Sequence, residues 1–182
     1  MHEMRERHEV RLSDGVVALS PLRMDDLDAH LAGEDELLVR WLSGGPSTRE
    51  KAEAYFRLCL EQWESEGSLR AFGVRAGTEG VLAGTIDLRF GVEGLAPGQV
   101  NVAYGLYPSW RGRGLATRAV LLASRYAGTA GGKQAVIRVE PENLASAAVA
   151  RRAGFTPGGR TFGKDGTVLD WYTLDLHEPM VE

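Results

Sequence analysis

The feature that most constrains this chain is an apolar stretch that leads into a turn rich in arginine and glycine and then into a helical pattern. Residues 100–106 have the apolar character of a buried strand, and Pro108 ends it because proline has no N–H to give to a sheet. The turn Arg111-Gly-Arg-Gly114 follows directly. Beyond the turn, apolar side chains recur at the spacing of one helix face: Leu115, Ala119, Leu122 and Tyr126. The stretch therefore predicts a strand, a tight turn and a helix.

This turn has the chemistry of an anion-binding site. The start of a helix presents unpaired N–H groups and a partial positive charge, and Gly112 and Gly114 bring no side chains that would cover those groups. Two arginines add formal charge, so a phosphate or pyrophosphate is the favoured ligand. The alternative is a surface loop whose arginines are merely solvated. A Walker-type loop does not fit because its sequence is missing, and a dinucleotide fingerprint would lack its third glycine.

Composition limits the class of protein. The chain has 182 residues, 43% hydrophobic and 25% charged, which predicts one globular domain over residues 1–182, with 1–9 frayed at the start. A net charge of −4 argues against broad binding to nucleic acid or to an anionic membrane. The charged start and the lack of a long apolar run predict a cytoplasmic protein. The single cysteine, Cys59, falls on an apolar helix face and is expected to fill the core rather than react.

The hydrophobic periods predict a mixed α/β (α+β) chain with about seven strands. Helical segments are expected at 22–31, 34–42, 47–63, 115–127 and 143–153. The segment 47–63 begins with a capping box formed by Ser47 and Glu50. Strands are expected at 16–19, 69–75, 81–90, 100–106, 136–139, 155–162 and 168–176.

Two motifs in this order of elements resemble the GNAT superfamily of N-acetyltransferases. The first is the turn from Arg111 to Ala116, and the second runs from Asn143 through Ser146 to Gly154-Phe155. The serine and the two-part N-terminal helices resemble the Rim-type branch, whose best-known members acetylate the N-termini of ribosomal proteins. The resemblance implies a central twisted mixed sheet, splayed between its fourth and fifth strands, with helices on both faces. It also implies acetyl-CoA (coenzyme A) as co-substrate and no metal.

The same resemblance assigns roles to individual residues. The pyrophosphate of acetyl-CoA would lie on the turn formed by Arg111, Gly112, Arg113, Gly114, Leu115, Ala116 and Thr117. The N–H of Leu106 would polarise the thioester carbonyl and stabilise the oxyanion. Asn143 would hold the pantetheine arm. Arg152 would reach the nucleotide phosphates, or it would only favour the C-terminal end of its helix.

The chain departs from the family at both proton-transfer positions. Ala150 stands where many relatives carry a tyrosine that protonates the sulfur, so the resemblance assigns the acid to Ser146 or leaves it as an ordinary helix-start serine. Asn101 stands where many relatives carry a glutamate base. Strand alternation puts Asp87 on the polar face near the cleft, as a base acting directly or through water. The alternative is that Asp87 only pairs with Arg89 or solvent.

The expected activity is transfer of an acetyl group to a primary amine, on a protein N-terminus or a small molecule, by direct attack in a ternary complex. Because of Ala150 and Asn101, a catalytically idle acyl-CoA-binding module stays open as an alternative, as does a transferase with a longer acyl donor. Acids at Glu34, Asp35, Glu36 and Glu93 would attract a cationic amine or simply be solvated. The exposed edge of the last hairpin could pair two subunits into a homodimer.

Overall fold

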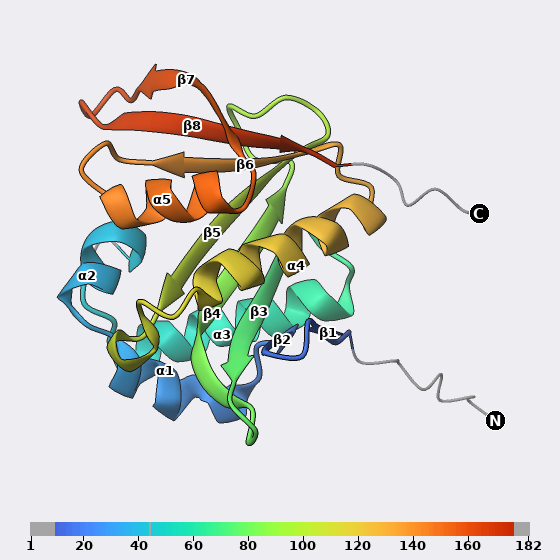
Figure 1. Ribbon diagram of the computed structural model, residues 1–182. Helices are drawn as coiled ribbons and strands as arrows, with labels where there is room; N and C mark the ends of the chain where they lie inside the picture. The colour runs from blue at the N-terminus through green and yellow to red at the C-terminus, as the bar shows by residue number, and fades with distance from the viewer. Residues whose placement is uncertain (1–9, 44, 177–182) are drawn as a thin grey trace, which may run out of the picture.

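The computed structural model describes residues 10–43 and 45–176, so the expectation for residues 1–9 lies outside the described part of the chain. These residues form one mixed sheet with helices on both faces (Figure 1). In chain order the elements are β1 (Leu12–Ser13), β2 (Val17–Pro21), the 3₁₀ turn η1 (Met24–Asp26), α1 (Leu27–Gly33), α2 (Glu36–Leu38), the π-helical turn η2 (Val39–Ser43), α3 (Arg49–Glu64), β3 (Leu69–Ala76), β4 (Val81–Phe90), β5 (Gln99–Leu106), the 3₁₀ turn η3 (Pro108–Trp110), α4 (Leu115–Thr129), β6 (Gln134–Val139), α5 (Leu144–Arg152), β7 (Thr156–Phe162) and β8 (Val168–Asp175).

The sheet has the order β1-β2-β3-β4-β5-β6-β8-β7, and β5 and β6 are its only parallel neighbours among the described strands. Their pairing is short: residues 99–101 lie beside 134–136, and beyond Asn101 the two strands diverge. This confirms the predicted splay, because β5 and β6 are the fourth and fifth of the expected strands. The sheet has eight strands rather than about seven, since the two-residue β1 is too short to show a pattern in the sequence.

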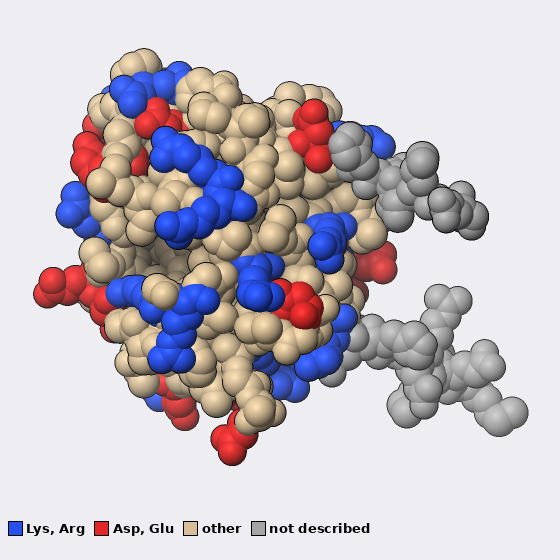
Figure 2. Space-filling model, in the orientation of Figure 1, with Lys and Arg blue, Asp and Glu red and all other residues tan. Residues whose placement is uncertain are grey.

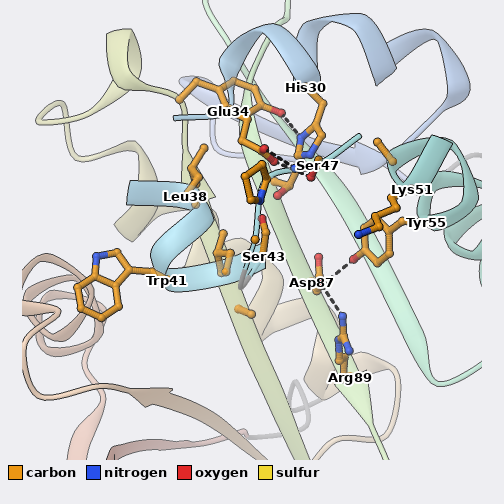
Figure 3. Close-up of a pocket in the computed structure, with 18 of the residues that line it drawn as sticks. His30, Glu34, Leu38, Trp41, Ser43, Ser47, Lys51, Tyr55, Asp87 and Arg89 are labelled. Carbon is orange, nitrogen blue, oxygen red and sulfur yellow. Dashed lines mark hydrogen bonds and ion pairs between the residues drawn. The ribbon is translucent and has the colours of Figure 1, made fainter. Parts of the chain in front are cut away.

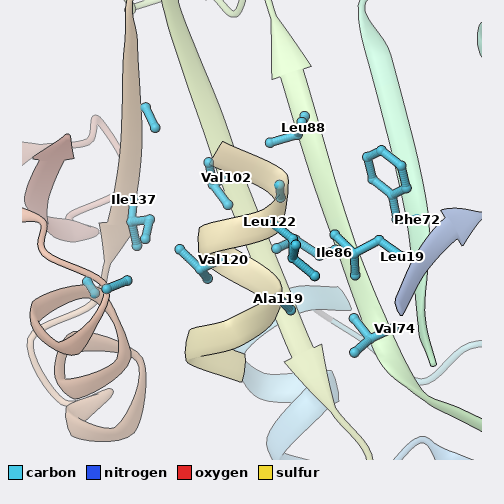
Figure 4. Close-up of a cluster of buried hydrophobic side chains, with 14 of the residues drawn as sticks. Leu19, Phe72, Val74, Ile86, Leu88, Val102, Ala119, Val120, Leu122 and Ile137 are labelled. Carbon is cyan, nitrogen blue, oxygen red and sulfur yellow. The ribbon is translucent and has the colours of Figure 1, made fainter. Parts of the chain in front are cut away.

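The face that carries α4 and α5 holds the larger core. Side chains of Ile86 and Leu88 from β4 and Val102 from β5 pack under Ala119, Val120 and Leu122 of α4 (Figure 4). The predicted apolar face of this helix is confirmed, because Leu115, Ala119 and Leu122 are buried and Tyr126 packs against the cluster. Burial of Ile86 and Leu88 on this side directs Asp87 to the opposite face.

The opposite face is covered by α1 and α3. Phe56 and Cys59 of α3 are almost completely buried against Ala71 and Tyr107, and burial raises the pKa of the Cys59 thiol to about 12. This confirms that Cys59 belongs to the core.

Two local predictions on this face are wrong in detail. The N-cap of α3 is Thr48, which accepts a hydrogen bond from the Lys51 N–H, and not Ser47. Ser47 does not cap the helix, because its N–H and its hydroxyl both donate hydrogen bonds to the carboxylate of Glu34. The helix expected over 34–42 is divided into α2 and η2. Its second part is wound as a π-helix, a form found frequently at functional sites.

None of the helices in the described ranges is long and apolar enough to cross a membrane.

Candidate active site

The turn before α4 is open and rich in free donors. Gly112 and Gly114 have φ angles of +74° and +75°, a region that favours glycine, and a Cβ added at either would meet no atom within 4 Å. The N–H groups of residues 114–117 have no hydrogen-bond partner among the described residues. Unpaired donors at the start of a fifteen-residue helix, with bare space in front of them, fit a phosphate group.

Basic side chains flank this space. Figure 2 shows lysine and arginine side chains on both sides of a hollow between α5 and the turn that precedes α4. On the turn, the guanidinium of Arg113 lies 5.1 Å from the ring centre of Trp110. Arg152 is exposed in the last turn of α5. The surroundings of the turn are therefore electropositive, although the chain as a whole is acidic.

The side chain of Arg111, unlike that of Arg113, is bound to other parts of the protein. Its guanidinium makes a bidentate pair with Asp35, at 2.7 and 2.8 Å, and its Nε donates to the carbonyl of Leu106 at 2.9 Å. The hydrogen bond from Arg111 lowers the pKa of Asp35 to about 2. Arg111 therefore fastens the turn to α2 and to the end of β5.

The backbone of β5 leaves a free donor at the splay. The N–H of Tyr107 donates to the carbonyl of Ala83, on the β4 side. Because successive N–H groups along a strand point to opposite edges, the N–H of Leu106 points away from β4, to the side from which β6 has diverged. The predicted oxyanion donor, the N–H of Leu106, thus has no hydrogen-bond partner within the described part of the chain and lies at the edge of the splay.

Two cavities meet at this strand. One, of about 240 Å³, lies beside the diverging strands and is lined in part by Tyr104, Asn143 and Ser146. The other, of about 730 Å³, lies on the α3 face and is lined in part by His30 and Asp87. Both cavities share Trp41, Leu42, Asn101, Ala103 and Arg138. A group in one cavity can therefore approach a group in the other across β5.

Ser146 is tied to a tyrosine that the sequence pattern did not select. Asn143 caps α5 by accepting the Ser146 N–H at 3.2 Å. The Tyr104 hydroxyl donates to the Ser146 carbonyl at 2.9 Å and also lies 2.9 Å from Ser146 Oγ. Burial raises the pKa of Tyr104 to about 12, so its proton is held firmly at neutral pH. The pair joins β5 to α5, and long-range pairing of this kind has no signal in one sequence.

Asp87 extends into the larger cavity from β4 (Figure 3). It accepts a hydrogen bond from the Tyr55 hydroxyl at 2.8 Å and one from Arg89 at 3.3 Å. Its side chain is 14% exposed. Burial raises its pKa, and the bonds from Tyr55 and Arg89 only partly offset that effect. Both sequence-based expectations therefore find a counterpart: Asp87 pairs with Arg89, and it also lines the cavity.

The charged side chains around the larger cavity include both acids and bases. Asp35 is neutralised by its ion pair with Arg111. Glu34 accepts two hydrogen bonds from the neutral Ser47 and keeps its negative charge at the wall of the cavity. Asn101 accepts the Arg138 Nε–H at 2.9 Å. Arg138 was missed in the sequence, although a charge inside the apolar strand 134–139 is a signal that could have found it. The described residues contain no group of three or more His, Cys, Asp or Glu side chains that could hold a metal.

Comparison with known proteins identifies the family to which the chain belongs. A family model described as "Acetyltransferase (GNAT) domain" matches residues 17–156. A search of curated proteins gives no match. Among solved structures, a GNAT-family acetyltransferase from Bacillus anthracis superimposes with a TM-score of 0.76 at 16% identity, covering 93% of this chain and 100% of that one.

Two further structural neighbours are named for their activities. RimL, a ribosomal L7/L12 alpha-N-protein acetyltransferase in complex with coenzyme A, gives a TM-score of 0.77 at 17% identity over 92% of this chain and 98% of that one. Spermidine N-acetyltransferase from Vibrio cholerae, in complex with CoA and spermine, gives 0.72 at 15% identity over 88% and 95%. At these identities the neighbours establish the fold alone. Because RimL is one of them, the chain shares its fold with the Rim-type enzymes. The family model, which covers most of the chain, shows that the chain belongs to the GNAT family of acetyltransferases.

Proposed function

We propose that the protein transfers an acetyl group from acetyl-CoA to a primary amine by direct attack. The observation that carries the proposal is the meeting of two cavities at β5. The cavity beside Ser146 lies at the splay, near an unpaired N–H, and the other contains a buried carboxylate. RimL and spermidine N-acetyltransferase, which share the fold, act on amines according to their names and have been crystallised with CoA.

The turn before α4 fits the diphosphate of acetyl-CoA. The N–H groups of residues 114–117 would donate to it, with Gly112 leaving room and Arg113 and Arg152 supplying positive charge. Arg111 would act indirectly, by holding the turn in place through Asp35. Asn143 lines the smaller cavity, where it would contact the pantetheine arm. Acetyl-CoA supplies the acetyl group as a thioester, which is activated for attack by nitrogen.

Asp87 would accept the proton that the amine loses. An alkyl amine with a pKa of about 10.4, or an α-amino group at about 8, is mostly protonated at neutral pH and cannot attack in that form. A carboxylate whose pKa is raised by burial is a stronger base than a solvated one. The hydroxyl of Tyr55 and the guanidinium of Arg89 fix its orientation.

Leu106 and Ser146 would complete the transfer. The Leu106 N–H donates to the carbonyl oxygen as negative charge develops there, a contribution of about 3 kcal/mol in comparable sites. A C–N bond forms, the C–S bond breaks, the nitrogen loses its second proton to solvent, and the Ser146 hydroxyl gives its proton to the departing sulfur. The Tyr104 hydroxyl, 2.9 Å from Ser146 Oγ, would turn its proton from the Ser146 carbonyl to that oxygen, replace the proton that the serine gives up, and then be reprotonated from solvent. In this role Tyr104 would stand in for the family tyrosine, whose position is occupied here by Ala150.

A specific observation favours a second candidate, a module that binds acyl-CoA without turnover. Ala150 and Asn101 occupy the two positions where many family members carry proton-transfer residues. Ala150 is fully buried, and the side chain of Asn101 accepts a hydrogen bond from Arg138.

A thiol-release assay tests both candidates. Acetyl-CoA is supplied with a panel of N-terminal peptides, amino acids, polyamines and aminoglycosides, and CoA binding is measured separately by calorimetry. Amine-dependent release of free thiol supports the transferase. Binding of CoA without release from any amine would instead support the idle module.

A further inference from the structure

Arg138 brings a cation to the place where the two cavities meet. It projects from β6, is half-buried, and lines both cavities. Its Nε donates to Asn101 Oδ1, and its guanidinium lies 5.7 Å from the ring centre of Trp171. Among the described residues, its other two nitrogens have no hydrogen-bond partner and no carboxylate forms an ion pair with it. Burial lowers the pKa of Arg138, as expected for a charge without a partner anion.

The other charges of the larger cavity do not neutralise Arg138. The lining contains three cations (Lys51, Arg89, Arg138) and two carboxylates (Glu34, Asp87). Glu34 is engaged by Ser47, and Asp87 is engaged by Tyr55 and Arg89. Glu140, two residues further along the chain than Arg138, lines only the smaller cavity. A half-buried arginine left without a carboxylate is costly unless a ligand supplies the anion.

We infer that the acceptor amine carries an anionic group, a carboxylate or a phosphate, which binds Arg138 while the amine lies at Asp87. This inference rests on the proposed function and names its substrate class. A guanidinium with two free nitrogens matches the two oxygens of a carboxylate or phosphate. A polyamine, which has only cations to offer, would place a second positive charge against Arg138.

The register of the strands sets the spacing between amine and anion. Asp87 lies opposite Ala103, while Arg138 contacts Asn101, which is two residues away along β5. Asp87 and Asn101 are therefore diagonal neighbours on adjacent antiparallel strands, and such positions lie about 7 to 8 Å apart. This is the separation between the amino group and the carboxylate of a dipeptide, so glycylglycine is a suitable probe.

Steady-state kinetics with matched acceptors test the inference. Thiol release is measured with glycylglycine, its C-terminal amide, 3-aminopropyl phosphate and 1,5-diaminopentane. The peptide and its amide have similar amines and differ in the anion. We expect the KM for glycylglycine or for the phosphate to be at least about tenfold below that for the amide, and the lower of the two identifies the anion. Equal KM values for anionic and neutral amines, or a lower KM for the diamine, would overturn the inference.

Variants of Arg138 test whether this residue causes the preference for anionic amines. Arg138→Gln keeps a donor for Asn101 but removes the charge, and we expect it to raise the KM for the anionic amine about tenfold and to leave the amide unchanged. Arg138→Lys should keep the preference in part. Arg125→Gln, at an exposed position on α4, is the control. A loss of CoA affinity in Arg138→Gln, with the acceptor KM unchanged, would assign Arg138 to the cofactor and contradict the inference.

Direct binding separates this inference from the proposed function. N-acetylglycylglycine has the carboxylate but no reactive amine, and its binding is measured by calorimetry. If no amine gives thiol release but this peptide binds the wild type and not Arg138→Gln, the transferase proposal fails and the anion site stands. If turnover is robust and the peptide binds both proteins equally, the anion site fails and the transferase stands.

Discussion

At the scale of the residue, Asp87 combines access to the larger cavity with a raised pKa. Its environment explains both properties: burial disfavours the charged form, and Tyr55 and Arg89 hold the carboxylate in one orientation. A base of this kind is active when ionised, so the rate should rise with pH as Asp87 loses its proton.

Replacing Asp87 with asparagine should remove that ionisation. We expect kcat/KM at neutral pH to fall roughly 100-fold, the usual scale of general-base catalysis. The remaining activity should rise toward alkaline pH, where the amine deprotonates unaided. The measurement is the pH profile of kcat/KM, with Asp28→Asn, at an exposed carboxylate, as control. An unchanged profile in Asp87→Asn would remove Asp87 from the base role.

Ser146 and Tyr104 should act as a unit in proton donation. Ser146→Ala and Tyr104→Phe are each expected to lower kcat about tenfold or more, with little change in the dissociation constant for CoA, because they remove hydroxyls and keep the shape. The double variant should lose little beyond the worse single variant, since both changes interrupt one path. Full activity in Ser146→Ala would exclude the serine as the acid.

At the scale of the element, α2 and η2 form a wall of the larger cavity, and η2 also lines the smaller one. This segment is fastened at Glu34 by Ser47 and at Asp35 by Arg111. Leu38 and Leu42 lie so close to Gly105 that a Cβ there would overlap their side chains. The close approach of this wall to β5 thus depends on one glycine in the strand.

Gly105→Ala should therefore move the wall without unfolding the sheet. The displaced atoms are the ends of flexible leucine side chains, so we expect a raised KM for the amine and an almost unchanged affinity for CoA. Steady-state kinetics with calorimetry for CoA check this. Equal KM values for variant and wild type would show that the wall does not shape the acceptor site.

The sequence patterns predicted elements better than contacts between them. The apolar face of 115–126 and the glycines of the turn are local features, and both appear as predicted. The pattern predicted Ser47 as a helix cap, but its hydroxyl instead donates a hydrogen bond to Glu34, thirteen residues earlier in the chain. The bond between Tyr104 and Ser146 and the exposure of Arg138 to both cavities depend on how β5 and β6 diverge. A single sequence carries no measure of that divergence.

At the scale of the whole molecule, a buried ion pair joins the N-terminal segment to the sheet. Arg75 of β3 holds both oxygens of Asp26 at 2.6 and 2.9 Å, and the two side chains are 11% and 8% exposed. Burial raises the pKa of Asp26, but the bonds from Arg75 and from the Arg23 N–H outweigh it, so the net shift is downward.

Breaking this pair should weaken the entire fold. Asp26→Asn leaves Arg75 without its anion, and we expect a loss of about 3 kcal/mol in the free energy of unfolding. Because the folded pKa is lowered, the wild-type advantage should be complete above the unfolded pKa of about 3.9 and be lost as pH falls through the folded value. Urea unfolding between acidic and neutral pH measures it. Asp170→Asn, in an exposed pair with Arg160, is the control and should change little. Similar losses in both variants would contradict this account.

The central claim is that the diphosphate of CoA lies on the open turn before α4, and calorimetric titration of CoA tests it most directly. Gly114→Leu is compared with Gly131→Leu, at the other end of α4, because both glycines have positive φ and open space at Cβ and so impose similar backbone strain. The account predicts at least about tenfold weaker binding in Gly114→Leu and wild-type binding in Gly131→Leu. Wild-type affinity for CoA in a folded Gly114→Leu protein would contradict it.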